Sequence, residues 1–149
     1  MEPSFPPAII VRHRKENPKK CSVIPLKGRP GIEFLNYPLQ DKFSREGYIR
    51  LAADGPHLST ADVHLGILLL DGSWRWAGAM EKDFSHVPPR SLSGFQTAYP
   101  RVSKLGTDPD NGLASIEALY IALRTLSRPL EGILDNYRWK AEFLYKNGW

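Results

Sequence analysis

The segment Gly-Ile-Leu-Leu-Leu-Asp-Gly-Ser-Trp-Arg-Trp-Ala, residues 66–77, sets the architecture of the chain. Residues 66–70 form a short continuous apolar run, which is typical of a strand buried on both faces. A break follows at residues 71–73, and a helix is expected after it, with Trp74 in its first turn. Because ligands of open α/β sheets bind just outside the carboxyl ends of such strands, we expect Asp71 and Trp74 at the mouth of a site. The alternative interpretation is a turn aspartate and a core tryptophan.

The rest of the chain alternates predicted strands with predicted helices. Apolar runs predict strands at residues 8–11 and 48–52 and a short strand near 90–94. Helical spacing of apolar residues predicts helices over 75–84, 113–126 and, opening at Ser127 and Pro129, a last helix with Leu130, Ile133, Tyr137, Ala141 and Leu144 on its inner face. Residues 59–62 match a weak capping box at a further helix start. This alternation favours an α/β fold with a largely parallel sheet in a single domain, residues 1–149.

Composition narrows the classes of function. No apolar run approaches the roughly 20 residues of a membrane helix, so we expect no membrane partner. The single Cys21 excludes an internal disulfide and favours a reducing compartment, which makes the cytoplasm the expected location. Four histidines with no metal-ligand spacing predict no metal site, and nucleotide-binding glycine motifs are missing as well. One of the histidines, His13, falls in a basic segment and is expected to be solvated.

Positive charge is concentrated at the N-terminal end. The chain carries a net charge of +4, and residues 1–50 hold ten Lys/Arg against five Asp/Glu, so residues 51–149 carry −1. Such a basic portion can attract a phosphate backbone, which makes RNA a candidate partner. A solvated basic face without a partner is the alternative.

Five short motifs, in order along the chain, resemble those of the ribosomal RNA aminocarboxypropyltransferases of archaea and eukaryotes and of the bacterial DTW-domain family. Those families carry, from the N-terminus, DPKKCS/T, SPAD, DCSW (DGTW in the DTW branch), LSTxEAL and FxWGxxFLxxN. The matching stretches here are residues 17–22, 59–62, 70–74, 113–119 and 137–147. Order and rough spacing hold from about residue 12 to the end.

The resemblance implies a fold and an activity. The fold would be SPOUT-like, a mostly parallel sheet with flanking helices and a C-terminal trefoil knot, and residues 60–149 would form the knotted, cofactor-binding portion. The activity would be transfer of the 3-amino-3-carboxypropyl (acp) group of S-adenosylmethionine to N3 of a uridine-type base in RNA. The chain resembles the members of this superfamily that are monomers.

The resemblance also implies site residues. Asp71 is the candidate catalytic base, although an electrostatic or structural role is an equal alternative. Trp74 offers a flat apolar face with cation–π potential beside the transferred arm. The remaining cofactor-binding positions are Ser22 at the amino-acid arm, the Leu70 backbone at the ribose, and Leu92, Asn111 and Ser115 around the adenine. For Ser22 and Ser115 the alternative is ordinary helix capping.

One stretch departs from the family pattern. Residues 93–104 replace the AANPVNYG segment of the rRNA branch, and only Tyr99 is retained convincingly. Because that loop should contact cofactor or target, three other readings stay open: a tRNA uridine acp-transferase of the DTW type, a SPOUT RNA methyltransferase, and a non-catalytic RNA-binding or ribosome-assembly protein.

Overall fold

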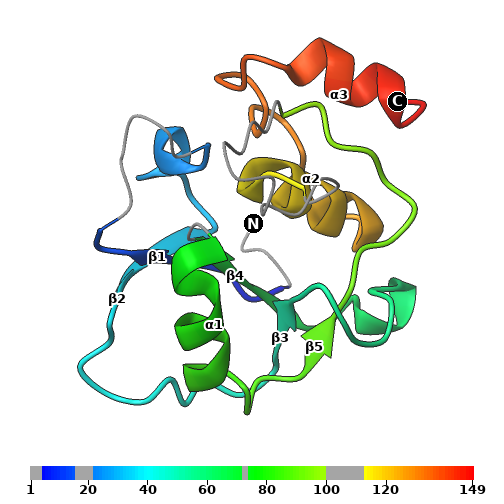
Figure 1. Cartoon of the computed structure of the whole chain (residues 1–149). Coiled ribbons are helices and arrows are strands. Elements are labelled where there is room, and N and C mark those ends of the chain that lie inside the picture. Colours follow the sequence, from blue (N-terminus) through cyan, green and yellow to red (C-terminus); the bar gives the residue numbers. More distant parts are fainter. Residues whose placement is uncertain (1–4, 16–21, 72–73, 100–112) are drawn as a thin grey trace.

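Five parallel strands form one sheet in the order β2-β1-β4-β3-β5 (Figure 1). The structure is a computed structural model that describes residues 5–15, 22–71, 74–99 and 113–149, with residues 74–77 described by their backbone alone. The strands are β1 (Ala8–His13), β2 (Ile32–Tyr37), β3 (Tyr48–Leu51), β4 (Gly66–Asp71) and β5 (Pro89–Arg90). The expected α/β fold with a parallel sheet is therefore confirmed.

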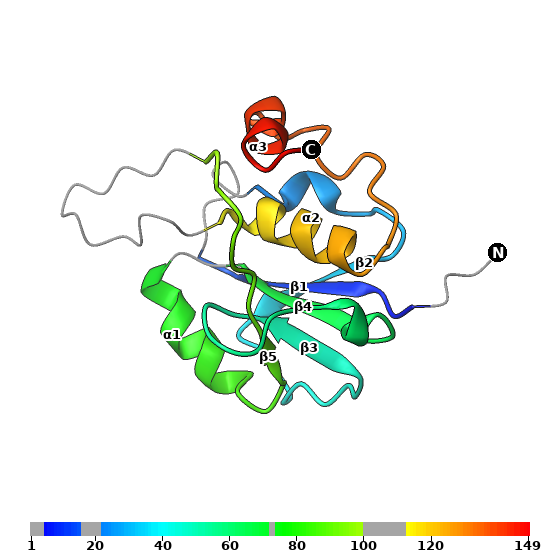
Figure 2. The same ribbon diagram turned by 90° about the vertical axis from the view of Figure 1, so that its right-hand side faces the viewer.

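Helices cover both faces of the sheet (Figure 2). The helix α1 (Trp74–Asp83) lies on one face and α2 (Ser115–Thr125) on the other, with α3 (Lys140–Lys146) beyond α2. Two short 3-10 turns, η2 (Ile24–Leu26) and η3 (Thr60–Asp62), lie in the connections that precede β2 and β4. None of the helices in the described ranges has the length and apolar character of a membrane span.

Two hydrophobic cores form because β1 and β4 are buried on both faces. Side chains of a strand alternate between its faces. In β4, Ile67 and Leu69 therefore join the core under α2, while Leu68 joins the core under α1. In β1, Ile10 and Ile9 divide between the two cores in the same way. This double burial explains why both strands read as continuous apolar runs.

The local signals at two segment boundaries are confirmed. The strand predicted at 66–70 is β4, and the helix predicted after it is α1. At Ser59 both halves of the capping box form: the Ser59 hydroxyl accepts the Ala61 N–H at 3.3 Å, and Asp62 accepts the Ser59 N–H at 3.2 Å. The element that follows is a single 3-10 turn.

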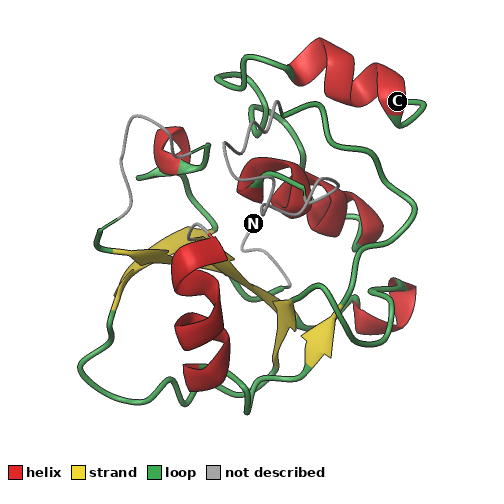
Figure 3. Ribbon diagram, in the orientation of Figure 1, coloured by secondary structure: helices red, strands yellow, loops and turns green. Residues whose placement is uncertain are grey.

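The last helix is shorter than the spacing of apolar residues predicts, and that prediction is wrong. Only α3 is helical, and turns occupy the chain between α2 and α3 (Figure 3). Gly132 has a φ of 77°, which a right-handed helix does not allow, and Ser127 leaves α2 with a φ of 57°. Ala141, expected on an inner face, is exposed.

The strand β2 was not expected from the sequence. Polar Glu33 and Asn36 interrupt its apolar residues, and it is an edge strand that pairs only with β1 in the described sheet. A half-buried edge strand does not need the continuous apolar run by which β1 and β4 are recognised. The segment 100–112, which contains Asn111 and belongs to the portion expected to be knotted, lies outside the described residues.

Candidate functional site

A buried ion pair lies at the carboxyl edge of the sheet. Asp71 is the last residue of β4, and Arg12 of β1 is its register partner. The Arg12 Nε and the Asp71 Oδ2 lie 3.8 Å apart, and each residue is only 7% exposed. In parallel strands these ends share one edge of the sheet, which is where α/β folds place their ligands. The alternative interpretation of Asp71 as a turn residue is therefore wrong, because Asp71 ends β4 as a buried and partnered carboxylate.

The N-terminus of α2 is joined to the same carboxylate. Ser115, the first residue of α2, donates its hydroxyl proton to Asp71 Oδ1 at 2.5 Å. The positive end of the α2 dipole, which favours negative charge, is thereby held close to Asp71. Two sequence motifs that lie 44 residues apart meet in this contact.

Ser22 supplies the N-terminal cap of α2 from a distant part of the chain. The N-cap residue of α2 is Ala114, which has no side-chain acceptor for the first amides of the helix. The Ser22 Oγ accepts the Ile116 N–H at 3.1 Å instead, across 94 residues. Ser22, Ser115 and Asp71 therefore belong to one connected cluster around the start of α2. The capping alternative for Ser22 is confirmed as a contact, and a hydroxyl that accepts one bond can still donate its proton.

Glu117 fixes the chain on both sides of the segment 100–112. It is 0% exposed, and its carboxylate accepts four hydrogen bonds. Two come from the preceding chain, from the Thr97 hydroxyl at 2.6 Å and the Ala98 N–H at 2.8 Å. The others come from the Ala114 N–H at 2.8 Å and the Tyr137 hydroxyl at 2.9 Å. A buried carboxylate is tolerated here because its lone pairs are occupied.

His13 follows Arg12 at the end of β1, and the expectation that it is solvated is wrong. It is the last residue of β1 and is buried. Its Nδ1 accepts the Lys15 N–H at 3.1 Å, and its ring lies 5.6 Å from that of Tyr37. The apolar run of the first strand ends at Val11, so the sequence pattern places neither Arg12 nor His13 in the strand, whereas β1 extends to His13. The signal that would have found them is their place at the carboxyl end of a strand parallel to β4.

Among the described residues, the structure does not bring the remaining predicted cofactor-binding positions together as it does Ser22, Asp71 and Ser115. Leu70 is half-buried in β4 and packs against the core under α1, whereas Leu92 follows β5 and packs against the core under α2. Their side chains thus lie on opposite faces of the sheet. Trp74 is the first residue of α1, described by its backbone, and Asn111 lies outside the described residues. Within the described part of the chain no group of three or more His, Cys, Asp or Glu has a metal-binding arrangement.

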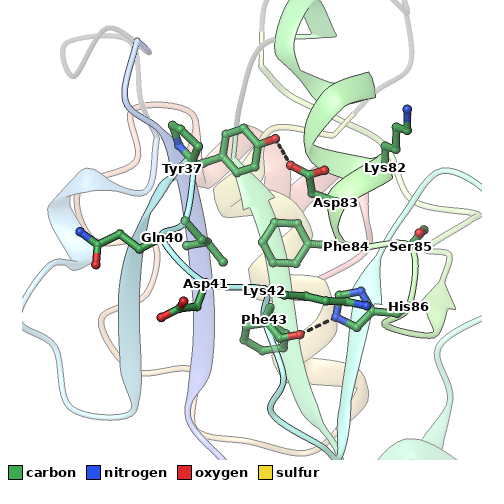
Figure 4. A pocket seen from close by; sticks show the side chains of 12 residues that line it. Tyr37, Gln40, Asp41, Lys42, Phe43, Lys82, Asp83, Phe84, Ser85 and His86 are labelled. Carbon is green, nitrogen blue, oxygen red and sulfur yellow. Dashed lines mark hydrogen bonds between the residues drawn. The ribbon is translucent and has the colours of Figure 1, made fainter.

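A cavity of about 400 Å³ opens on the α1 face (Figure 4). It is lined by the end of β2, the loop after it and the C-terminal end of α1. The Tyr37 hydroxyl donates to the Asp83 carboxylate, and this hydrogen bond, followed by burial, raises the pKa of Tyr37 above its ordinary value. The His86 Nε2 lies 2.5 Å from the Phe43 carbonyl oxygen. Beside the cavity, the Tyr37 ring also contacts the ring of His13 at the end of β1.

Comparison with known proteins identifies a likeness in fold. No family model matches the sequence, and no curated protein matches it. Among solved structures, the SAM-dependent rRNA:acp-transferase Tsr3 from Vulcanisaeta distributa superposes with a TM-score of 0.71 at 20% sequence identity. The match covers 95% of this chain and 78% of the Tsr3 chain. The chain therefore shares the fold of Tsr3 over nearly its whole length.

Proposed function

We propose that the chain is an RNA aminocarboxypropyltransferase, which moves the acp group of S-adenosylmethionine to N3 of a uridine or pseudouridine in ribosomal RNA. The observation that supports this most is the meeting of three motif residues, Ser22, Asp71 and Ser115, at the carboxyl edge of the sheet. The motifs that contain these residues resemble those of this class of enzyme, and the fold resembles that of an rRNA acp-transferase.

The residues of the cluster fit the chemistry of S-adenosylmethionine. This cofactor would supply an electrophilic carbon beside a sulfonium cation, on an arm that carries an ammonium and a carboxylate. The buried carboxylate of Asp71 complements the positive groups, and the N-terminal end of α2 with the Ser22 hydroxyl complements the negative one. Trp74, at the start of α1, would present a flat apolar face to the cation. In this proposal the Leu70 backbone would meet the ribose, and Leu92 and Asn111 would lie around the adenine.

In this reaction the protein would determine which carbon of the sulfonium faces the nucleophile and would hold it in position. The sulfonium has three electrophilic carbons, so the group transferred depends on which carbon faces the nucleophile. Holding the amino-acid arm between Ser22 and Trp74 would present the arm and turn the methyl group away. In a balanced reaction N3 would bond to the arm carbon, the carbon–sulfur bond would break to release 5′-methylthioadenosine as the neutral thioether, and the N3 proton would pass to solvent water.

The contacts of Asp71 favour an electrostatic role over that of a base. One of its oxygens accepts the Ser115 hydroxyl proton, and the other faces the Arg12 guanidinium. A carboxylate held on both sides is a fixed charge that positions its neighbours, rather than a mobile acceptor for the N3 proton.

The proposed RNA partner would meet the exposed cations of residues 1–50. Two cations of residues 1–50 are buried and therefore unavailable: Arg12, which pairs with Asp71, and Arg50, which pairs with Glu81 at 2.7 Å. Arg14 and Lys42 are exposed and remain candidates. We expect RNA affinity to fall steeply with salt, and Arg14→Gln to lower the slope of log K against log[salt] by about one.

Isotope transfer separates the candidate reactions. RNA from cells lacking the protein would be incubated with the purified chain and S-adenosylmethionine that is labelled either at the carboxyl carbon or at the methyl carbon. Carboxyl label entering rRNA supports the proposal. Methyl label alone would indicate a methyltransferase, and carboxyl label in tRNA alone would indicate the DTW type. RNA binding with no heat of S-adenosylmethionine binding would indicate a non-catalytic RNA-binding protein.

Matched variants test the site itself. Trp74→Ala and Ser115→Ala are expected to lower S-adenosylmethionine affinity by at least tenfold. Tyr145→Ala, at an 85% exposed aromatic residue, and Ser85→Ala, at an exposed serine, are the controls and should bind like the parent chain. Equal S-adenosylmethionine affinity of all four variants would show that the cofactor does not bind at the proposed site. The trefoil knot belongs to the same proposal, and tracing residues 100–112 in a crystal structure would test it.

A further inference from the structure

A second cavity, of about 220 Å³, lies at the opposite edge of the sheet from Asp71. It is formed where β2 begins, where α2 ends and where the chain enters β1. Two guanidinium groups, those of Arg29 and Arg128, line it. Its other described lining residues are apolar or glycine: Phe5, Pro30, Gly31, Ile32, Leu123, Pro129 and Ile133. No acidic side chain is among the described residues that form this wall.

Arg128 is buried with part of its hydrogen-bonding capacity unmet. The residue is 4% exposed, and its Nη2 donates to the carbonyl oxygens of Val63, at 3.1 Å, and Leu65. Its Nε and Nη1 are inaccessible to solvent and have no hydrogen-bond partner among the described residues. Burial lowers the pKa of Arg128, yet an arginine stays charged in a protein. A buried cation with unmet donors is costly unless an anion completes it.

Phe5 covers this guanidinium. Its ring centroid lies 4.8 Å from the Arg128 Cζ. Two residues further on, the chain is fixed by the hydrogen bond of the Tyr48 hydroxyl to the Pro7 carbonyl oxygen at 2.7 Å. Movement of the Phe5 ring would open the guanidinium to the cavity without disturbing that anchor.

We propose that this cavity binds the carboxylate of a small apolar group, as presented by the C-terminal residue of a partner peptide with an aliphatic side chain. The carboxylate would accept hydrogen bonds from Arg128 and Arg29, and the side chain would pack on the apolar wall. Arg29 already donates one bond to the Glu131 backbone carbonyl, which fixes its position at the cavity. The proposal does not depend on the transferase activity.

The size and lining of the cavity select this ligand class. Binding sites for drug-sized molecules measure about 300–1,000 Å³, so this cavity suits a single residue rather than a long acyl chain. Two guanidiniums match a carboxylate, and capture of a C-terminal carboxylate is a recurring mode of peptide recognition. A phosphate would leave more of its oxygens facing apolar side chains, which is unfavourable.

The test uses N-acetyl-leucine as the probe, titrated into the full ¹⁵N-labelled chain. We expect saturable amide shifts at Gly31, Ile32 and Leu123, with at least tenfold weaker binding of N-acetyl-leucinamide, which lacks the carboxylate. Equal binding of the amide would overturn the proposal. Tighter binding of inorganic phosphate or of hexanoate would also overturn it, in favour of a phosphate group or a fatty acid.

Variants assign the binding to the two arginines. Arg29→Gln and Arg128→Gln are each expected to weaken N-acetyl-leucine binding at least fivefold, while Arg138→Gln, at an exposed arginine, should leave it unchanged. Arg29 is the second variant in case Arg128→Gln does not fold. Normal affinity in Arg29→Gln would overturn the proposal.

Two further variants test what covers the guanidinium. Phe5→Ala is expected to tighten binding about threefold, and weaker binding would overturn the role of Phe5 as a cover. Glu2→Gln should leave affinity unchanged. A tenfold gain in N-acetyl-leucine affinity in Glu2→Gln would show that the Glu2 carboxylate occupies the site, and would overturn the proposal of a partner peptide.

Discussion

At the scale of single residues, Arg12 and Asp71 depend on each other. Both side chains are about nine-tenths buried, at 9% and 11% exposure, so each charge has lost most of its hydration. Removing one partner of a buried pair leaves the other uncompensated, which costs about 3–5 kcal/mol, whereas replacing both by apolar groups is often neutral. The pair therefore links stability to the proposed cofactor site.

Asp71→Asn is predicted to lower the free energy of unfolding by about 3 kcal/mol, measured by urea denaturation, because Arg12 stays buried and charged. Asp71→Asn combined with Arg12→Met should recover much of this stability without recovering S-adenosylmethionine binding in calorimetry. Asp135→Asn, in an exposed pair with Lys140, is the control and should change stability by less than about 0.5 kcal/mol. An unchanged midpoint in Asp71→Asn would contradict the account.

Glu117→Gln is predicted to destabilise the chain by about 2–4 kcal/mol, because an amide group replaces one acceptor oxygen with a donor that faces other donors. The same variant should loosen both chain segments that Glu117 holds, seen as faster amide exchange at Ala98 and Ala114. Glu142→Gln, at an exposed residue of α3, is the control. Unchanged exchange at the two amides would show that Glu117 does not fix these segments.

The raised pKa of Tyr37 predicts that the folded chain loses stability at alkaline pH. Its pKa is raised in the folded chain by the hydrogen bond to Asp83, relative to about 10 in the unfolded chain. The stabilisation is therefore fully present below pH 10 and is lost as the pH rises through the folded value. Between pH 9 and 12 the parent chain should lose stability more steeply than Tyr37→Phe. Tyr145→Phe should follow the parent, and parallel curves for the parent and Tyr37→Phe would contradict the prediction.

At the scale of elements, two glycines give opposite predictions. A Cβ at Gly66, the first residue of β4, would overlap Cε2 of the buried Tyr48 ring, so Gly66→Ala should destabilise by about 1–3 kcal/mol. A Cβ at Gly78 in α1 would meet no atom within 4 Å, and Gly78→Ala should stabilise by about 0.5–1 kcal/mol through helix propensity. Thermal unfolding of both variants checks the signs, and equal shifts would be against this reading.

How far the sequence predicts these elements depends on whether the deciding contact is local. The strands β1 and β4 are predictable because burial on both faces requires a continuous apolar run. The cap of α2 is not predictable from local sequence, because Ala114 offers no acceptor and Ser22 supplies it from 94 residues away. The prediction of a long last helix failed because Gly132 has a positive φ, which interrupts the helix although the apolar residues there recur at helical spacing.

At the scale of the whole molecule, the direction of the strands separates the two proposed sites. Because the strands are parallel, the carboxyl ends of β1 and β4 bring Arg12 and Asp71 together at one edge. The residues that precede β4 offer their carbonyl oxygens to Arg128 at the other edge. The motif residues could be predicted to gather at the first edge, but the cavity at the second depends on packing between β2, α2 and the entry to β1, which no local pattern encodes.

The parallel order also decides how the chain can assemble during synthesis. No two neighbouring strands of this sheet can be closed by a hairpin, so every pairing waits for a long crossover to be completed. The interior strand β1 is made before both of its neighbours, β2 and β4, and gains the second of them only when β4 has been made. Such sheets fold slowly and expose their apolar strands meanwhile. The nascent chain should therefore depend on holding chaperones until Asp71 has left the exit tunnel.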